Sequence, residues 1–210
     1  MRILVVCAVA RELGGLARRA EVDVIAVGVG PVEAAYGATR ALASGAYDVV
    51  INAGIAGGFT GRCSVGDAVV CAREEFIDLG LEDGSPFPLP GGQQLVRAVE
   101  CDRALLQPFL DGVVPVIVGR GVTSSIVTTT GARAALIAAR HNPDVESMEG
   151  FAVLRAAQAA GVPAIEIRGV SNVVGDRANN GWNFAAGADA AVGTTDAYLD
   201  VLLSMPERTR

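Results

Sequence analysis

The sequence predicts an α/β fold: a three-layer α/β/α sandwich with a largely parallel, mixed central sheet. Apolar runs of strand length alternate with Ala-rich stretches of helical length along the chain, which favours parallel strands covered by helices on both faces of a sheet. The chain has 210 residues, 51% of them hydrophobic, which suffices for one well-packed core. We therefore expect residues 1–210 to form a single domain.

The expected strands are short apolar runs rich in Val and Ile. The first of them is interpreted as a buried strand, because it is continuously apolar. In chain order the expected strands are Ile3–Ala8, Val22–Val27, Asp48–Asn52, Asp67–Phe76, Val114–Val118, Asp144–Ser147 and Ala164–Val170.

The expected helices alternate with these strands and carry start and stop signals. Pro31 opens one helix, as Pro often does at the first helical position, and Gly161 and Pro163 end another. A Pro- and Gly-rich segment, Glu82–Gly92, is the one long loop, and long loops in compact domains are usually functional. The expected helices are Ala10–Arg19, Pro31–Gly45, Arg103–Leu110, Gly131–Arg140, Met148–Ala160 and Asn183–Leu203.

The charge of the chain limits the kind of partner it binds. The formal net charge is −6 and no cluster of Lys or Arg offsets it, which disfavours nucleic acid or an anionic membrane as a partner. No apolar run approaches the ~20 residues of a membrane span, and Ile3–Ala10 is too short for a signal peptide. The four cysteines show no metal-ligand spacing, which predicts reduced thiols and no metal. We expect a cytoplasmic protein with a small-molecule substrate.

Two features that invite a functional interpretation have simpler ones. Gly28-Val29-Gly30 would need a third glycine at position 33 to match a dinucleotide fingerprint, but Glu33 stands there and would repel a pyrophosphate. The segment is interpreted as a tight strand-to-helix turn. His141, the only histidine, lies at an expected helix end, where His is more often a favourable charge than a catalyst.

Polar side chains gather where expected strands end, which is where ligands bind to parallel sheets. Glu12 follows the first strand, residues 146–150 span a strand-to-helix junction, and residues 168–172 end a later strand. The glycines of Asn52–Gly58 would let a ligand approach main-chain groups closely. Taken alone, Glu12 could be a helix-dipole partner, Asn52–Gly58 a simple bend and Asn172 a cap at its strand end.

Taken together, these segments resemble the nucleoside phosphorylase and nucleosidase superfamily. They are Glu12, then Asn-Ala-Gly-Ile-Ala-Gly-Gly (52–58), Glu-Ser-Met-Glu-Gly (146–150) and Arg-Gly-Val-Ser-Asn (168–172). Ser-Met-Glu-Gly, and Ser-Asn followed by Arg177 and Trp182-Asn183, are most similar to the futalosine hydrolase family. That resemblance implies hydrolysis of the N-glycosidic bond of futalosine, with release of hypoxanthine, in menaquinone biosynthesis. A methylthioadenosine/adenosylhomocysteine-type nucleosidase and a non-catalytic nucleoside-binding module remain alternatives.

The resemblance also implies roles for the residues that match. Glu12 is the base that activates water, and Glu149 holds the ribose 2′- and 3′-hydroxyls, since an ionised carboxylate accepts from two donors. Met148 packs on the sugar. Arg168 and Ser171 support Glu12 and the base site.

The remaining implied contacts surround the purine and the sugar. Asn172 stands where adenine-specific relatives carry Asp, and its amide can donate to the leaving purine, so we count it with Glu12 as catalytic. The other expected substrate contacts are Ala56 and Gly57 in the glycine-rich segment, Val127 stacking on the base, Trp182 near the sugar, and Phe87 in the long loop. We expect a homodimer in which that loop reaches the partner's pocket. Neither a cofactor nor a metal is expected.

Ile55 is a departure from the superfamily pattern. Relatives carry Ser or Thr at this position, and in phosphorylases that hydroxyl helps to hold phosphate. The anion-binding arginines of phosphorylases also have no clear counterpart here. Hydrolysis is therefore expected rather than phosphorolysis.

Overall fold

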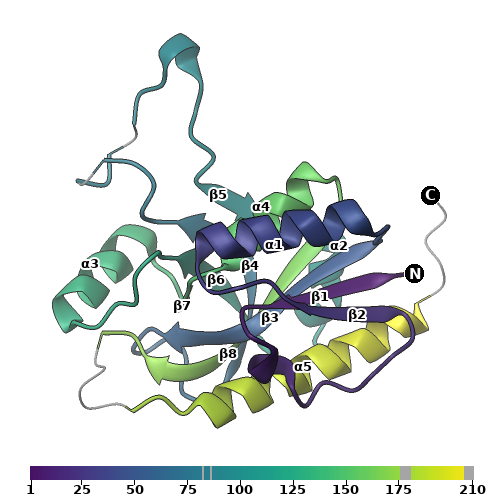
Figure 1. Cartoon of the computed structure of the whole chain (residues 1–210). Helices are drawn as coiled ribbons and strands as arrows, with labels where there is room; N and C mark the ends of the chain where they lie inside the picture. Colours follow the sequence, from purple (N-terminus) through teal and green to yellow (C-terminus); the bar gives the residue numbers. More distant parts are fainter. Residues whose placement is uncertain (82, 86, 176–180, 206–210) are drawn as a thin grey trace.

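The computed structural model describes residues 1–81, 83–85, 87–175 and 181–205. In this part of the chain, eight strands form one mixed sheet in the order β2-β1-β3-β7-β6-β4-β5, and β8 pairs with both β3 and β4 (Figure 1). The expected α/β fold is confirmed. The strands are β1 (Ile3–Cys7), β2 (Val22–Ala26), β3 (Val49–Gly58), β4 (Ala68–Phe76), β5 (Ala98–Glu100), β6 (Ile117–Thr123), β7 (Val145–Ser147) and β8 (Ala164–Val173).

Helices cover both faces of the sheet and complete the three layers (Figure 1). Helices α1 and α4 pack on each other over one face, and α5 lies along β8 and β3 on the other. A close approach of α5 requires Gly169 in β8, where any Cβ would collide with the carbonyl oxygen of Gly187. The helices are α1 (Pro31–Ser44), α2 (Arg103–Leu110), α3 (Gly131–His141), α4 (Gly150–Ala159) and α5 (Phe184–Ser204), with two short 3₁₀ helices, η1 (Ala10–Leu13) and η2 (Pro90–Gly92).

Five of the strands pair in a closed circuit. Strand β8 joins β3 to β4, and β6 and β7 complete the circuit from β4 back to β3. Strand β7 runs antiparallel to β3 and places Glu146 opposite Gly57, while β8 places Asn172 opposite the same glycine. The ends of β3, β7 and β8 therefore meet, and they bring together the polar segments that are far apart in the sequence.

The expected helix Ala10–Arg19 is wrong. Only the single turn η1 forms, and the chain turns at Gly14 and Gly15 and continues without regular structure toward β2. Glycine loses more conformational freedom than any other residue when it enters a helix. Two consecutive glycines therefore favour ending the helix after one turn, which leaves Glu12 on a short, fixed element.

The strands also differ from expectation in several places. Strand β3 continues to Gly58 instead of ending at Asn52, because pairing with β7 and β8 holds the glycine-rich segment extended. Strand β6 begins only at Ile117, after Pro115, which has no N–H to donate to a sheet. Strand β5 was not expected, and it pairs antiparallel with β4.

The segment between β4 and β5 projects from the body of the molecule (Figure 1). It contains most of the expected loop Glu82–Gly92, of which Glu82 and Pro86 lie outside the described residues. Within the described ranges, no helix has the length and apolar character that a membrane span would require.

Candidate active site

Two buried carboxyl groups and one buried guanidinium meet at the end of the sheet nearest η1. Glu12 comes from η1, Glu149 stands directly before α4, and Arg168 comes from β8. Their exposed fractions are 3% for Glu12, 5% for Glu149 and 0% for Arg168. The sequence predicted all three as site residues, and the structure brings them together.

Main-chain groups fix the Glu12 carboxyl group at both oxygens. Its Oε2 accepts from the Val9 N–H at 3.0 Å and its Oε1 from the Ile55 N–H at 3.1 Å. A Cβ at Gly54 would stand 2.9 Å from Glu12 Oε1 and 2.8 Å from Arg168 Nη1, so only glycine fits between them. Ile55 thus contributes its main-chain N–H, while its side chain offers no hydroxyl to an anion.

Glu149 is held from the turn that precedes α1. Its Oε1 accepts from the Gly30 N–H at 2.9 Å, and Gly30 has a φ of 88°, which favours glycine. The Gly28-Val29-Gly30 segment is a strand-to-helix turn, as predicted, and its Gly30 N–H binds the Glu149 carboxylate. Burial raises the pKa of Glu149 above its usual value, although the charge of Arg168 and the Gly30 hydrogen bond oppose this rise.

Arg168 lies between the carboxyl groups. Its Nε donates to Glu166 Oε1 at 2.6 Å, and its Nη1 lies 4.0 Å from Glu149 Oε2. Burial alone would lower the pKa of Arg168, but the surrounding carboxylates, Glu166 foremost, hold that pKa above its usual value. The guanidinium is therefore a permanent positive charge that offsets several buried carboxylates.

Ser171 and Asn172 line the end of β8 beside β3. Ser171 Oγ lies 2.9 Å from Asn172 Oδ1 and 3.2 Å from the Ala56 carbonyl oxygen, and its one proton can be donated to either. Asn172 Nδ2 donates to the Val173 carbonyl oxygen at 3.3 Å. Within the described residues the second N–H of this amide has no hydrogen-bond partner, and Gly57 opposite it leaves the side chain uncovered by a Cβ.

The predicted sugar and base contacts lie near this strand end. Trp182 is adjacent to Asn183, whose N–H donates to the Ser171 carbonyl oxygen at 2.8 Å. Val127 is half-buried and precedes Thr128, which hydrogen-bonds to Glu146 opposite Gly57. Half-buried Met148 directly precedes Glu149.

Phe87 lies elsewhere, in the projecting β4–β5 segment, and is 46% exposed. Phe87 is predicted to contact the pocket of a partner subunit, so its distance from the site of its own chain does not test that prediction. His141 also lies away from the site, at the end of α3, where its Nδ1 is 3.3 Å from Glu75 Oε1. The pairing agrees with the non-catalytic interpretation of this histidine.

Sequence reasoning assigned no role to three buried acids near the site. Thr128 donates to Glu146 from its N–H at 2.9 Å and from its Oγ1 at 2.5 Å, and burial raises the pKa of Glu146. Glu74 and Glu166 are each 0% exposed and lie beside Arg168. Glu166 could have been noticed in the sequence because it is a lone acid between Ile165 and Ile167. It also stands two positions before Arg168, so the two side chains share one face of the strand.

Comparison with known proteins matches residues 3–203 to the model of the phosphorylase superfamily. The chain is 39% identical to the futalosine hydrolase of Streptomyces coelicolor over 83% of this chain and 76% of that protein. It is 31% identical to a 5′-methylthioadenosine/S-adenosylhomocysteine nucleosidase of Bacillus licheniformis over 74% of this chain and 69% of that protein. The native structure of futalosine hydrolase of Helicobacter pylori has the same fold, with a TM-score of 0.79 at 17% identity over 95% of this chain and 97% of that one.

Proposed function

The chain belongs to the phosphorylase superfamily, and we propose that it hydrolyses the N-glycosidic bond of futalosine, releasing hypoxanthine and dehypoxanthine futalosine. The observation that carries the proposed chemistry is the convergence of Glu12 and Glu149 on Arg168, on the strand whose end carries Asn172. The relation to the Streptomyces futalosine hydrolase supports the choice of substrate. We place the reaction in menaquinone biosynthesis and in the cytoplasm, where the four free thiols would stay reduced.

Glu12 acts as the base in this proposal. Cleavage of an N-glycosidic bond builds positive charge on the ribose ring, and a carboxylate near the anomeric carbon can take a proton from the attacking water. The N–H groups of Val9 and Ile55 orient the carboxylate and leave lone pairs free to accept that proton. Because Glu12 is fixed before substrate arrives, no reorganisation is needed during the reaction.

Glu149 holds the sugar, and Asn172 assists the leaving purine. Arg168 Nη1 lies 4.0 Å from Glu149 Oε2, beyond hydrogen-bond distance, so this oxygen can accept from the ribose hydroxyls. The positive charge of Arg168 offsets the repulsion between the Glu149 and Glu12 carboxylates and opposes the rise of the Glu149 pKa that burial causes. Asn172 donates its second N–H to O6 or N7 of hypoxanthine as negative charge develops on the base.

The charge of the site favours water over phosphate as the nucleophile. Glu12, Glu149 and Glu166 surround one guanidinium, and Arg168 already donates to Glu166. A phosphate dianion would meet more negative than positive charge there. Ile55 adds no hydroxyl that could bind it.

A methylthioadenosine/adenosylhomocysteine-type activity is the second candidate, because the Bacillus nucleosidase is also a relative. Purified protein should therefore be given futalosine and methylthioadenosine in parallel, with hypoxanthine and adenine quantified by chromatography. The proposal predicts the higher kcat/KM for futalosine. A preference for methylthioadenosine would replace the proposed substrate with the alternative.

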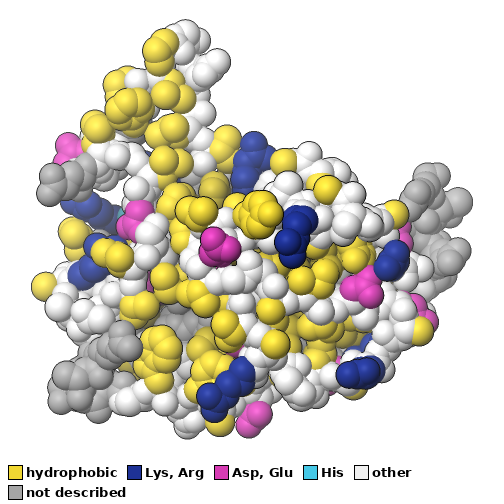
Figure 2. Space-filling view, in the orientation of Figure 1, with side chains coloured by type: hydrophobic (Ala, Val, Ile, Leu, Met, Phe, Trp, Pro, Cys, Tyr) yellow, Lys and Arg dark blue, Asp and Glu magenta, His cyan; other side chains and the backbone are white. Residues whose placement is uncertain are grey.

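We also propose a homodimer. Large apolar side chains are exposed on and before α1, with Val29 54%, Val32 77% and Tyr36 63% exposed. Figure 2 shows hydrophobic side chains over this helix and along the projecting segment that carries Phe87. A partner covering both would bring Phe87 to the neighbouring pocket. Light scattering should give twice the chain mass, and a fully active monomer would contradict the proposal.

A further inference from the structure

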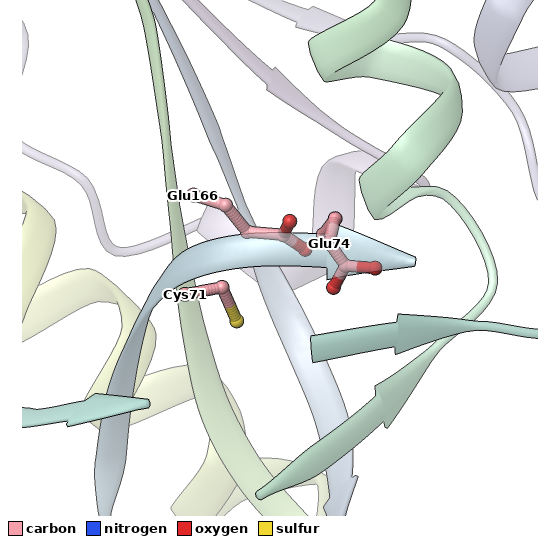
Figure 3. A group of neighbouring side chains, drawn as sticks. All are labelled: Cys71, Glu74 and Glu166. Carbon is pink, nitrogen blue, oxygen red and sulfur yellow. The ribbon is translucent and has the colours of Figure 1, made fainter. Parts of the chain in front are cut away.

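Two fully buried glutamates lie together beneath the N-terminus of α4. Glu74 in β4 and Glu166 in β8 are each 0% exposed. One carboxyl oxygen of each and the Cys71 thiol all lie within 4.8 Å of one another. Figure 3 shows the three side chains converging from the two neighbouring strands.

A β-bulge explains how Glu74 comes to this position. Side chains alternate between the faces of a strand, so Cys71 and Glu74, three positions apart, should point to opposite faces. The pairing of β4 with β6 skips Ala72, since Cys71 faces Gly119 and Arg73 faces Arg120. The extra residue turns Glu74 to the face of Cys71. Glu166 and Arg168, two positions apart on β8, share this face without any irregularity.

The two carboxyl groups have different partners. Glu166 Oε1 accepts from Arg168 Nε at 2.6 Å, whereas Glu74 Oε2 accepts from the Thr123 hydroxyl at 2.9 Å. Within the described residues, the other oxygens, Glu74 Oε1 and Glu166 Oε2, are buried and without a hydrogen-bond partner. A proton on Glu74 Oε1, donated to Glu166, satisfies both oxygens at once.

The environment assigns the proton to Glu74. Complete burial, with the negative charge of Glu166 in addition, raises the pKa of Glu74 well above its usual value. Two adjacent carboxylates in a buried site cannot both ionise, and Glu166 is the one that pairs with a cation. A metal ion is a poorer explanation, because the Arg168 guanidinium already donates to Glu166 and its positive charge would repel a metal cation at the same carboxyl groups.

We propose that Glu166 is a positioning residue for the hydrolysis: together with neutral Glu74, it fixes the Arg168 guanidinium so that Nη1 faces Glu12 and Glu149. This inference rests on the proposed function. Nη1 and Nη2 of Arg168 have no hydrogen-bond partner in the described part of the chain, so the Nε bond to Glu166 is the contact that sets the guanidinium plane. Without it, Arg168 would turn toward Glu149 or Glu12 and compete with the ribose hydroxyls or the water.

The test compares Glu74→Gln with Glu166→Gln. A glutamine reproduces a protonated Glu74, because its oxygen accepts from Thr123 and its N–H donates to Glu166. Glu74→Gln should therefore keep near-normal kcat. Glu166→Gln should lower kcat by at least about tenfold, since misplaced catalytic groups cost up to about 10²-fold. Equal losses in both variants, or no loss in Glu166→Gln, would overturn the inference.

A pH profile separates positioning from a merely structural role. In Glu166→Gln, Glu74 can ionise in place of Glu166, so the double variant Glu74→Gln/Glu166→Gln is needed to remove the charge. The guanidinium is then less compensated, and the acidic limb of kcat/KM should move to lower pH. An unmoved limb would contradict the inference. The titratable groups that face this region are Cys7, Glu12, Cys71, Glu74, Cys101, Glu149 and Glu166.

Two further measurements keep the test decisive. If Glu166→Gln does not fold, Glu166→Asp keeps the charge but shortens its reach, and the same loss in kcat is expected. Infrared difference spectra at neutral pH should show the carbonyl stretch of a protonated acid in the wild type that Glu74→Gln lacks, and its absence would overturn the shared proton. The spectra need no substrate, so they test the shared proton independently of the proposed function. Wild-type turnover of futalosine tests the proposed function alone, so failure of the inference can be told apart from failure of the proposed function.

Discussion

At the scale of single residues, the site depends on which atom of each carboxyl group is already engaged. Glu12 accepts one main-chain hydrogen bond at each oxygen, whereas Glu149 accepts one at Oε1 and leaves Oε2 facing Arg168 at 4.0 Å. Glu12 is therefore suited to be a fixed base, and Glu149 is suited to bind the sugar through its open oxygen. Replacing the two residues should accordingly affect turnover and substrate binding differently.

Glu12→Gln should lose most turnover and keep substrate binding. The amide cannot accept a proton from water, and loss of a general base typically costs about 10²–10⁴-fold. Glu149→Gln should weaken binding as well as turnover, because one acceptor for the ribose hydroxyls becomes a donor. Steady-state kinetics with calorimetric titration of a non-cleaved analogue would measure both effects. Near-normal turnover in Glu12→Gln would mean that another group is the base.

Asn172→Asp should change the choice between purines. The carboxylate would face O6 of hypoxanthine with like polarity but complement a 6-amino group. A mismatched buried polar pair costs about 1–3 kcal/mol, which corresponds to roughly 5- to 150-fold in discrimination. The ratio of kcat/KM for futalosine to that for its 6-amino analogue should fall. A uniform loss on both substrates would indicate that Asn172 only terminates its strand.

At the scale of elements, the sequence predicted the alternation of strands and helices but not their irregularities. The polar segments at 12, 146–150 and 168–172 could be recognised because each lies at or just after the end of an expected strand. The length of β3 could not, because it depends on pairing with β7 and β8 rather than on local preference. The bulge at Ala72 is likewise set by β6, so strict alternation gave no reason to place Glu74 beside Glu166.

The close approach of η1, β3 and β8 predicts a severe effect for Gly54→Ala. The new Cβ would stand 2.9 Å from Glu12 Oε1 and 2.8 Å from Arg168 Nη1, so both groups would have to move. A displacement of this kind can cost about 10²-fold in rate. Hypoxanthine release by folded protein, checked by circular dichroism, measures it.

The matched control is Gly193→Ala in α5, where a Cβ would meet nothing within 4 Å. It should leave activity unchanged and raise the free energy of unfolding by about 0.5–1 kcal/mol, because alanine suits a helix better than glycine. If Gly54→Ala kept the activity of this control, the packing between Glu12 and Arg168 would be looser than described.

At the scale of the whole molecule, buried acids make folding stability depend on pH. Burial raises the pKa of Glu74, Glu146 and Glu149, so the folded chain binds protons that the unfolded chain has released. Stability then falls as pH rises above the usual glutamate value of 4.5 and toward the raised values. This loss of folding stability is the consequence of burying the carboxyl groups in and around the site away from water.

Glu74→Gln should remove the contribution of Glu74 to the pH dependence of folding stability. The free energy of unfolding of the variant, relative to wild type, should increase with pH above 4.5, by up to about 1.4 kcal/mol per pH unit. Urea denaturation at a series of pH values measures this, with the exposed Glu21→Gln as a control that should show no such trend. A pH-independent difference would mean that Glu74 is ionised in the folded chain.

In the proposed reaction, this chain uses water rather than phosphate to release hypoxanthine from futalosine. It is tested most directly by identifying the sugar product of wild-type turnover with and without added phosphate. Hydrolysis predicts equal rates of hypoxanthine release in both conditions and a free reducing sugar as the second product. A sugar 1-phosphate, or a rate that requires phosphate, would contradict it.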